Sequence, residues 1–264
     1  MTDVSQLMKG LQKSLGNGQN ISEIMGQLNI AQNGGQSSQE AQELLKVFNP
    51  ALWNKVVDMQ DGFNENVVTN WKNQNLDWWM AIIDEVVEIL NSKSWKWWKG
   101  TDNYQKVDLA NVEVEMIDIF HFLLSLAIQN KHTDFIYSIL VAQSYGKSDK
   151  YIKDPDKLIE KVRKEMLVMS SFNLFEMVFV TWAEIWFGLD KSINDLVKSY
   201  MLKNALNIHR QKFGYKEGKY VKVWGDKEDN VIAWELSDNI DLNEKFFENI
   251  LQELEKYYVT KVIQ

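Results

Sequence analysis

The chain has 264 residues, a length that suits one large or two small domains and allows a sizeable buried core. It contains no cysteine, which excludes disulfide cross-links, thiolate zinc sites and a cysteine nucleophile. The 29 basic residues are outnumbered by 37 acidic residues, and the resulting formal charge of −8 argues against a general nucleic-acid or anionic-membrane binder.

The N-terminal segment, residues 1–45, differs in composition from the rest of the chain. It is rich in Gly, Gln, Asn and Ser and has too few apolar side chains to offset the entropy lost on ordering. We therefore predict a mobile polar extension, with short helical pieces around residues 4–15 and 21–28. Residues 46–264 are predicted to form one all-α domain.

The rest of the chain has the periodicity of helices. Pro50 stands where a helix is expected to start, and the spacing of apolar residues predicts helices over 71–91, 107–129, 135–143, 157–168, 173–187, 193–211 and 242–258. Residues 212–230, rich in Gly, Lys and aromatics, are expected to form an ordered loop or a short hairpin. The chain has neither a GxGxxG nor a GxxxxGKS motif, so Rossmann and P-loop folds have no support. The predicted fold is an all-α helical bundle.

Two pairs of acidic residues stand on two of these helices. Glu85 and Glu88, and then Glu115 and Asp118, are each spaced i, i+3, which places both carboxylates of a pair on one helix face. Such a pair, taken alone, most often marks a solvated helix edge. The helix over 107–129, however, is apolar nearly all round, which is typical of a buried helix.

Buried carboxylates in this number require neutralisation. Two ionised carboxylates about 5 Å apart repel by roughly 3 kcal/mol at an effective dielectric of about 20. Four converging carboxylates need protons, Arg or Lys partners, or divalent cations, and neither helix supplies an Arg or Lys on that arc. Oxygen ligands, in a chain without cysteine and with three histidines, favour Mg²⁺ or Mn²⁺ over zinc. The sequence therefore predicts a metal site.

The carboxylate pairs resemble the motif of a known enzyme family. ExxE on one helix, followed about 26 residues later by ExxD on the next, is similar to the all-α nucleotide pyrophosphatases and, more narrowly, to the dimeric dUTPase family, a relative of MazG-type and phage dCTPase/dUTPase enzymes. The segments that carry the match span about residues 55–235: DEVVEILNSKSWKWWK (84–99), EMIDIFHF (115–122), KNALNIHRQKFGYKEGKYVKVWGDKEDN (203–230) and, more weakly, MQDGFNENV (59–67).

The resemblance implies a reaction. Glu85, Glu88, Glu115 and Asp118 would be ligands of Mg²⁺, with Mn²⁺ as an alternative. The family hydrolyses dUTP, and also dUDP, to dUMP and releases pyrophosphate or phosphate. Either Glu85 or Glu88 would orient or deprotonate the attacking water, so that catalysis rests on positioning and on the electrostatics of the metal.

The C-terminal motif supplies candidate contacts for the phosphates and the sugar. Lys203, Asn207 and Arg210 are spaced i, i+4, i+7 and share one helix face, which by itself could equally be an exposed polar face. The resemblance makes them substrate contacts. It assigns the same role to Tyr215, Lys222 and Asn230, in a loop expected to close on the substrate.

Base recognition is assigned to a pair of amides. Gln60 and Asn64, spaced i, i+4, match the amides with which the family reads uracil. A side-chain amide can pair with the O4/N3 edge of uracil, and a flipped amide could suit cytosine. Trp78 is a candidate wall for the base, although packing in the core or in a dimer is an alternative for it and, still more, for the tryptophans at 95, 97 and 98.

Two other functions stay open at this point. One is the same chemistry on dCTP or another deoxynucleotide, and the other is a non-catalytic relative that binds a nucleotide or a partner. The resemblance implies a homodimer with a small deoxynucleotide substrate, and neither nucleic acid nor membrane as a partner. With no apolar run approaching eighteen residues and no signal peptide, we expect a cytoplasmic protein of a bacterium or of a virus-infected host cell.

Overall fold

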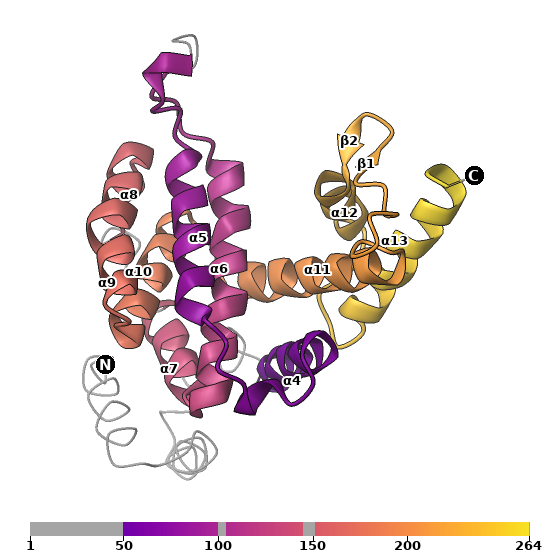
Figure 1. Ribbon diagram of the computed structural model, residues 1–264, viewed down its shortest axis with the longest axis horizontal. Coiled ribbons are helices and arrows are strands. Elements are labelled where there is room, and N and C mark those ends of the chain that lie inside the picture. Colours follow the sequence, from indigo (N-terminus) through magenta and orange to yellow (C-terminus); the bar gives the residue numbers. More distant parts are fainter. Residues whose placement is uncertain (1–49, 100–103, 145–150, 264) are drawn as a thin grey trace, which may run out of the picture. The chain divides into compact units, whose positions relative to one another are not determined.

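The computed structural model describes residues 50–99, 104–144 and 151–263. The extension predicted for residues 1–45 lies outside the described residues. The chain divides into two compact units: the first contains residues 74–193, and the second combines residues 50–73 with those after 193. The described residues of both units are mainly helical, which confirms the all-α prediction (Figure 1).

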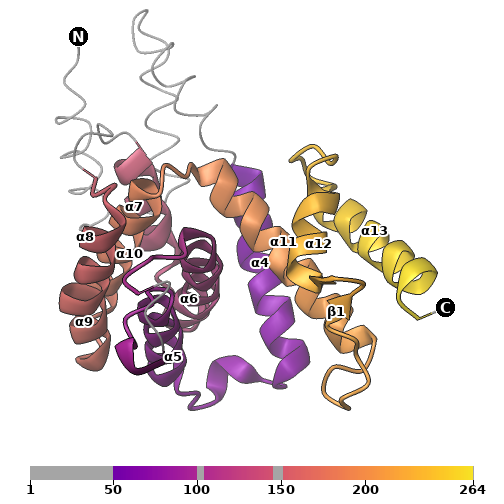
Figure 2. The same ribbon diagram turned by 90° about the horizontal axis from the view of Figure 1, so that it is seen from above.

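The first unit is a bundle of helices. Two of them, α5 and α6, lie side by side (Figures 1 and 2). A π-helical turn, Val162–Met166, joins α8 to α9. The bounds of the helices are α5 Trp78–Asn91, α6 Leu109–Asn130, α7 Thr133–Ser144, α8 Pro155–Lys161, α9 Leu167–Ser171 and α10 Phe175–Gly188.

The core of this unit is centred on Trp182 of α10, which is fully buried. Its indole Nε1 donates a hydrogen bond of 2.8 Å to the carbonyl oxygen of Met116 in α6. Its ring stacks on Phe120, Phe179 and Trp186, at centroid distances of 5.1, 5.5 and 5.8 Å. Aromatic burial of this size is a large part of a core's stability. It fixes α10 against the helix that carries Glu115 and Asp118.

A short backbone ladder sets the register of α5 against α6. The amide of Asp108 donates to the carbonyl of Ser92 at 2.9 Å, and Lys93 forms a β-bridge with Val107. The side-chain amide of Asn111 donates to Ser92 Oγ at 2.8 Å. These bonds join the end of α5 to the start of α6. They fix the positions of the two helices along their axes, and so the positions of the carboxylates that the helices carry.

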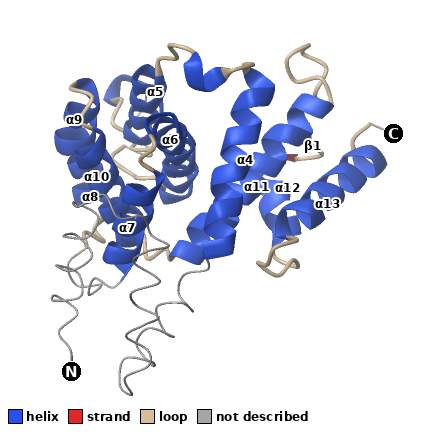
Figure 3. Ribbon diagram, turned by 90° about the horizontal axis from the view of Figure 1, so that it is seen from below, coloured by secondary structure: helices blue, strands red, loops and turns tan. Residues whose placement is uncertain are grey.

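The described residues of the second unit form helices and one small hairpin, whose strand β1 is red in Figure 3. The turn between the strands contains Gly225, whose φ of +74° suits glycine. Of the two alternatives predicted for residues 212–230, an ordered loop or a short hairpin, the structure confirms the hairpin. The bounds are α4 Pro50–Val67, α11 Ile193–Lys212, β1 Val223–Trp224, β2 Lys227–Glu228, α12 Asp229–Ser237 and α13 Phe246–Lys261.

An aromatic cluster forms the core around the hairpin. His209 of α11 is fully buried, with rings of Phe213, Trp224 and Tyr258 at centroid distances of 4.6, 5.5 and 5.0 Å. Within the described chain, neither of its ring nitrogens has a hydrogen-bond partner. Burial lowers the pKa of His209 to about 4, so the imidazole is neutral near pH 7.

One predicted helix boundary is corrected, and one helix was not predicted. The helix expected over 71–91 begins at Trp78, because the Asp77 side chain accepts a hydrogen bond from the Met80 amide and caps the helix there. Residues Trp71–Asn73 form a separate 3₁₀ turn. Helix α12 has no counterpart among the helices expected from the sequence. Among the described helices, none has the length and apolar content needed to cross a membrane.

Candidate functional site

Three of the four predicted metal ligands meet in the first unit. One carboxylate oxygen from each of Glu85, Glu88 and Glu115 lies within 4.8 Å of those of the other two. Glu115 is buried, Glu85 is half-buried and Glu88 is exposed. At that separation, two ionised carboxylates repel by about 3 kcal/mol at an effective dielectric of about 20. The cluster therefore offers the carboxylate oxygens that a divalent cation such as Mg²⁺ prefers as ligands.

Asp118, the fourth predicted ligand, stands one turn after Glu115 on α6. It is half-buried and lies outside the group of three whose oxygens are mutually close. Carboxylates at i, i+3 are neighbours on a helix surface, so a rotamer change or a coordinated water can link Asp118 to a metal centred on the other three.

In the second unit, the predicted base-reading amides form a buried hydrogen-bonded pair. Gln60 Nε2 donates to Asn64 Oδ1 at 3.0 Å, one turn along α4. The exposed fractions of these residues are 2% and 7%. Buried amides need partners, because an unsatisfied one costs roughly 1–3 kcal/mol.

Two residues that the sequence analysis missed continue this network. The Tyr200 hydroxyl of α11 donates to Gln60 Oε1 at 2.9 Å, and Asn204 Nδ2 lies 3.4 Å from the same hydroxyl. Burial raises the pKa of Tyr200, so the phenol stays protonated and can donate. Asn204 Oδ1 is buried without a hydrogen-bond partner among the described residues. The sequence signal for Tyr200 is its position three residues before Lys203, close to the helix face already singled out.

The predicted phosphate contacts of α11 lie close together, but Arg210 already has a partner. Its Nε and Nη2 donate to the two oxygens of Asp229 at 2.7 and 2.8 Å. Its Nη1 lies 3.4 Å from Asn207 Oδ1. Lys203 and Asn207 are half-buried. A bidentate guanidinium–carboxylate pair is both strong and directional.

The three predicted loop contacts are less enclosed. The ring of Tyr215 is half exposed, and the guanidinium carbon of Arg210 lies 6.0 Å from its centroid. Lys222 forms an exposed ion pair of 3.3 Å with Glu228. Asn230 is the second residue of α12, and its backbone amide donates to Asp229 Oδ1.

Trp78 takes part in packing within the first unit. Its indole Nε1 donates to Gln129 Oε1 at 2.9 Å, and its ring lies 6.3 Å from that of Phe122. Both partners belong to α6, so Trp78 joins the start of α5 to the end of α6. This contact matches the packing alternative, and its role as a wall for the base stays a prediction.

The core alternative for the other tryptophans is wrong. Trp95, Trp97 and Trp98 are 41, 64 and 56% exposed. Trp98 makes edge contacts with the other two, at centroid distances of 5.3 and 5.6 Å. These residues follow α5 in the connection to α6.

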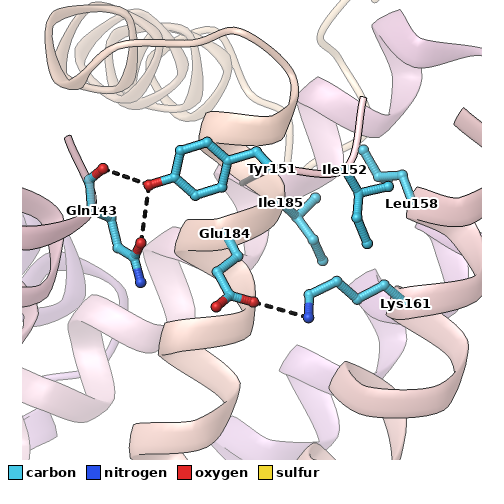
Figure 4. Close-up of a pocket in the computed structure, with 7 residues that line it drawn as sticks. All are labelled: Gln143, Tyr151, Ile152, Leu158, Lys161, Glu184 and Ile185. Atoms are coloured by element: carbon cyan, nitrogen blue, oxygen red, sulfur yellow. Dashed lines mark hydrogen bonds and ion pairs between the residues drawn. The ribbon is translucent and has the colours of Figure 1, made fainter. Parts of the chain in front are cut away.

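A cavity of about 190 Å³ lies elsewhere in the first unit. Figure 4 shows its polar side chains turned toward one another: the Tyr151 hydroxyl donates to Gln143, and Lys161 pairs with Glu184 at 2.9 Å. Its apolar lining comes from Ile152, Leu158 and Ile185. None of the predicted site residues lines this cavity.

The described residues thus combine an all-α fold with a cluster of carboxylates from two neighbouring helices. The model of the dUTPase family matches residues 52–215, more than half of the chain, and the protein belongs to that family. No curated protein matches the sequence. The matched segment contains the four predicted metal ligands, the amide pair and Arg210, and it ends before Lys222 and Asn230.

Proposed function

We propose that this protein hydrolyses dUTP to dUMP and pyrophosphate in a reaction that depends on Mg²⁺. The observation that carries the proposal is the mutual approach of Glu85, Glu88 and Glu115 within 4.8 Å. The family supports the general chemistry, a nucleotide pyrophosphatase. The choice of dUTP, the metal and the products are our proposal.

The donor set fits a hard cation. Glu85, Glu88 and Glu115 offer carboxylate oxygens, with Asp118 one turn further along α6, and Mg²⁺ prefers such ligands while keeping positions open for water and phosphate oxygens. When bound, Mg²⁺ would stabilise the charge of the polyphosphate and lower the pKa of a bound water. Mn²⁺ has the same ligand preference and would serve as an alternative.

Burial separates the roles of the glutamates. Glu115 is buried and is suited to holding a cation, whereas Glu85 and Glu88 reach the solvent-accessible side of the cluster. We assign to this pair the orientation of the attacking water and the acceptance of its proton. A positioned carboxylate of this kind contributes about 10²- to 10⁴-fold to a rate.

The hydrogen-bond direction in the second unit favours uracil over cytosine. Tyr200 donates to Gln60 Oε1, and Gln60 Nε2 donates to Asn64 Oδ1, so both amide oxygens act as acceptors inside the network. N–H groups of the amide nitrogens are then the groups suited to a base. They match an acceptor such as O4 of uracil and oppose the amino group at the same position of cytosine.

The phosphates are assigned to the basic and polar side chains of α11 and of the segment after it. Arg210 supplies a guanidinium fixed by Asp229, and Lys203 a half-buried ammonium group. The remaining proposed contacts to phosphate or sugar are Asn207, Tyr215, Lys222 and Asn230.

Pyrophosphate release from dUTP, dCTP, dTTP and UTP, each with Mg²⁺ and with EDTA, tests the proposal. We expect turnover with Mg²⁺ alone, strongest on dUTP, with dUMP as the nucleoside product. A preference for dCTP would keep the metal chemistry and contradict the base assignment. No turnover on any of the four would contradict the enzymatic function and favour a nucleotide-binding relative.

A further inference from the structure

Asp229, the first residue of α12, is a carboxylate with all its acceptor positions in use. Oδ2 accepts from Arg210 Nε at 2.7 Å and from the Tyr220 hydroxyl at 2.8 Å. Oδ1 accepts from Arg210 Nη2 and from the Asn230 amide, both at 2.8 Å. A carboxylate has about four lone-pair sites. Because the side chain is also fully buried, Asp229 can affect a ligand only through the groups that it holds.

The groups that it holds come from three separate segments. Arg210 is near the end of α11, Tyr220 belongs to the connection that follows, and Asn230 is in α12. Arg210 and Asn230 are both among the proposed substrate contacts. We propose that Asp229 is a positioning residue that aims the Arg210 guanidinium and fixes Asn230 for binding of the substrate's phosphates. This inference rests on the proposed function, which assigns the phosphates to Arg210.

The geometry of the pair fixes the plane of the guanidinium. Arginine has five N–H donors in a rigid fork. Two are taken by Asp229 and one is directed to Asn207 Oδ1 at 3.4 Å, which leaves two outside these bonds. With Nε and Nη2 fixed, the plane of the guanidinium is set and the two remaining N–H groups keep fixed directions, which is what a phosphate site requires.

The pair also sets the charge of the site. Burial acts to lower the pKa of Arg210, but the hydrogen bonds and the charge of Asp229 outweigh it, so the pKa is raised. The side chain of Arg210 is 14% exposed. A buried guanidinium without this carboxylate would be costly, and the carboxylate therefore allows a permanent positive charge to be kept where little water reaches it.

Asp229 is itself held in place by residues of the aromatic cluster around the hairpin. The ring of Tyr220 stacks on that of Tyr258 at 5.2 Å, and the Tyr258 hydroxyl accepts from the Val221 amide at 3.0 Å. The Asp229 amide donates to the carbonyl of Lys222 at 2.9 Å. The carboxylate is thus tied to the hairpin connection and to α13, and packing rather than a flexible loop determines where Arg210 points.

A double-mutant cycle tests the inference. The variants are Asp229→Asn, Arg210→Ala and the combination of both, measured for kcat and KM on dUTP and, by calorimetry, for affinity toward inorganic pyrophosphate. We expect Asp229→Asn to raise KM and weaken pyrophosphate binding by about tenfold or more, with a smaller change in kcat. In the Arg210→Ala background, the same change should add less than about twofold. Additive effects, or a loss in kcat alone, would overturn the positioning role.

A second variant covers the case in which Asp229→Asn does not fold. Tyr220→Phe removes one hydrogen bond from the carboxylate and keeps the ion pair, and we expect a KM increase of about two- to fivefold with folding preserved. An unchanged KM would overturn the inference. Glu255→Gln is the control, since it removes the 2.6 Å ion pair of Glu255 with Lys212, close to Arg210 along α11, without touching Asp229, and it should leave KM unchanged.

The measurement of pyrophosphate binding distinguishes a failure of this inference from a failure of the proposed function. If the wild-type protein hydrolyses no nucleotide but binds pyrophosphate with the coupling described, the proposed function fails and the positioning role stands. If the wild-type protein does not bind pyrophosphate, Arg210 has no phosphate role and the inference fails with it.

Discussion

Glu88 is the exposed member of the carboxylate cluster, and its substitution separates function from stability. Glu88→Gln removes one charge from three carboxylates that repel one another. We expect kcat on dUTP to fall by about 100-fold or more, because a ligand or base is lost. In EDTA the melting temperature should stay the same or rise, since the repulsion is relieved.

Asp84 offers a matched control for this variant. It is an exposed acid on the same helix, outside the group of close carboxylates. Asp84→Asn should retain wild-type kcat, and normal turnover by Glu88→Gln would contradict the role of Glu88.

Tyr200 gives a prediction for selectivity. Tyr200→Phe removes the hydroxyl that donates to Gln60 Oε1, so the Gln60 amide loses one of the hydrogen bonds that set its orientation. We expect the ratio of kcat/KM for dUTP over dCTP to fall by about tenfold, the cost of one buried hydrogen bond. Steady-state kinetics on both nucleotides measures it, and an unchanged ratio would contradict the proposed amide orientation.

His209 makes stability depend on pH. Its pKa is about 4 in the folded chain, against 6.5 for a histidine open to water, so the unfolded chain binds more protons between these values. Stability should therefore fall as pH drops from about 6.5 to 4, by up to about 3 kcal/mol, and the loss should level off below pH 4. His209→Phe should reduce the difference between the midpoints of urea unfolding at pH 7 and at pH 5. An equal pH dependence in both proteins would exclude His209 as its source.

At the residue scale, the sequence predicted the carboxylate cluster better than the groups that support the other candidate contacts. Glu85, Glu88 and Glu115 could be predicted because the spacing of residues along a helix shows which side chains share a face. Tyr200 and Asp229 could not be predicted in this way. Tyr200 bonds to Gln60, 140 positions away in the sequence, and Asp229 bonds to Arg210, 19 positions away. A buried polar partner of this kind has no local pattern.

At the level of elements, both carboxylate-bearing helices begin at an aspartate cap. Asp108 accepts from the Asn111 amide at 3.1 Å at the start of α6, as Asp77 does from Met80 at the start of α5. Asp108→Ala should lower the free energy of unfolding by about 1 kcal/mol, whereas Asp108→Asn, which can still cap, should cost a few tenths. Thermal unfolding compares the two, and equal losses would contradict the capping role.

The predictability of the elements follows the strength of their local signals. The long apolar pattern of α6 predicts both the helix and its burial. The predicted start of α5 is too early because Asp77 caps the helix at Trp78, and the mostly polar residues upstream include a separate 3₁₀ turn at Trp71–Asn73. Helix α12 is nine residues long and directly follows a hairpin, so its periodicity is too short to stand out.

For the whole molecule, assembly is a prediction of the family resemblance. We expect the full chain to elute from size-exclusion chromatography, with light scattering, at twice its mass of 30.9 kDa. A mass of one chain at every concentration tested would contradict the predicted homodimer.

A chain lacking residues 1–45 should retain wild-type kcat/KM, because the matched segment begins at residue 52.

The central claim is that the three clustered glutamates bind a divalent cation. The melting temperature of the wild-type protein with EDTA, with Mg²⁺, and with Mg²⁺ plus a non-hydrolysable dUTP analogue tests it most directly, with Glu115→Gln measured in parallel. The account predicts a rise with Mg²⁺, a larger rise with the analogue, and a loss of most of the Mg²⁺ shift in the variant. No shift in the wild-type protein with either addition, or an equal shift in the variant, would contradict it.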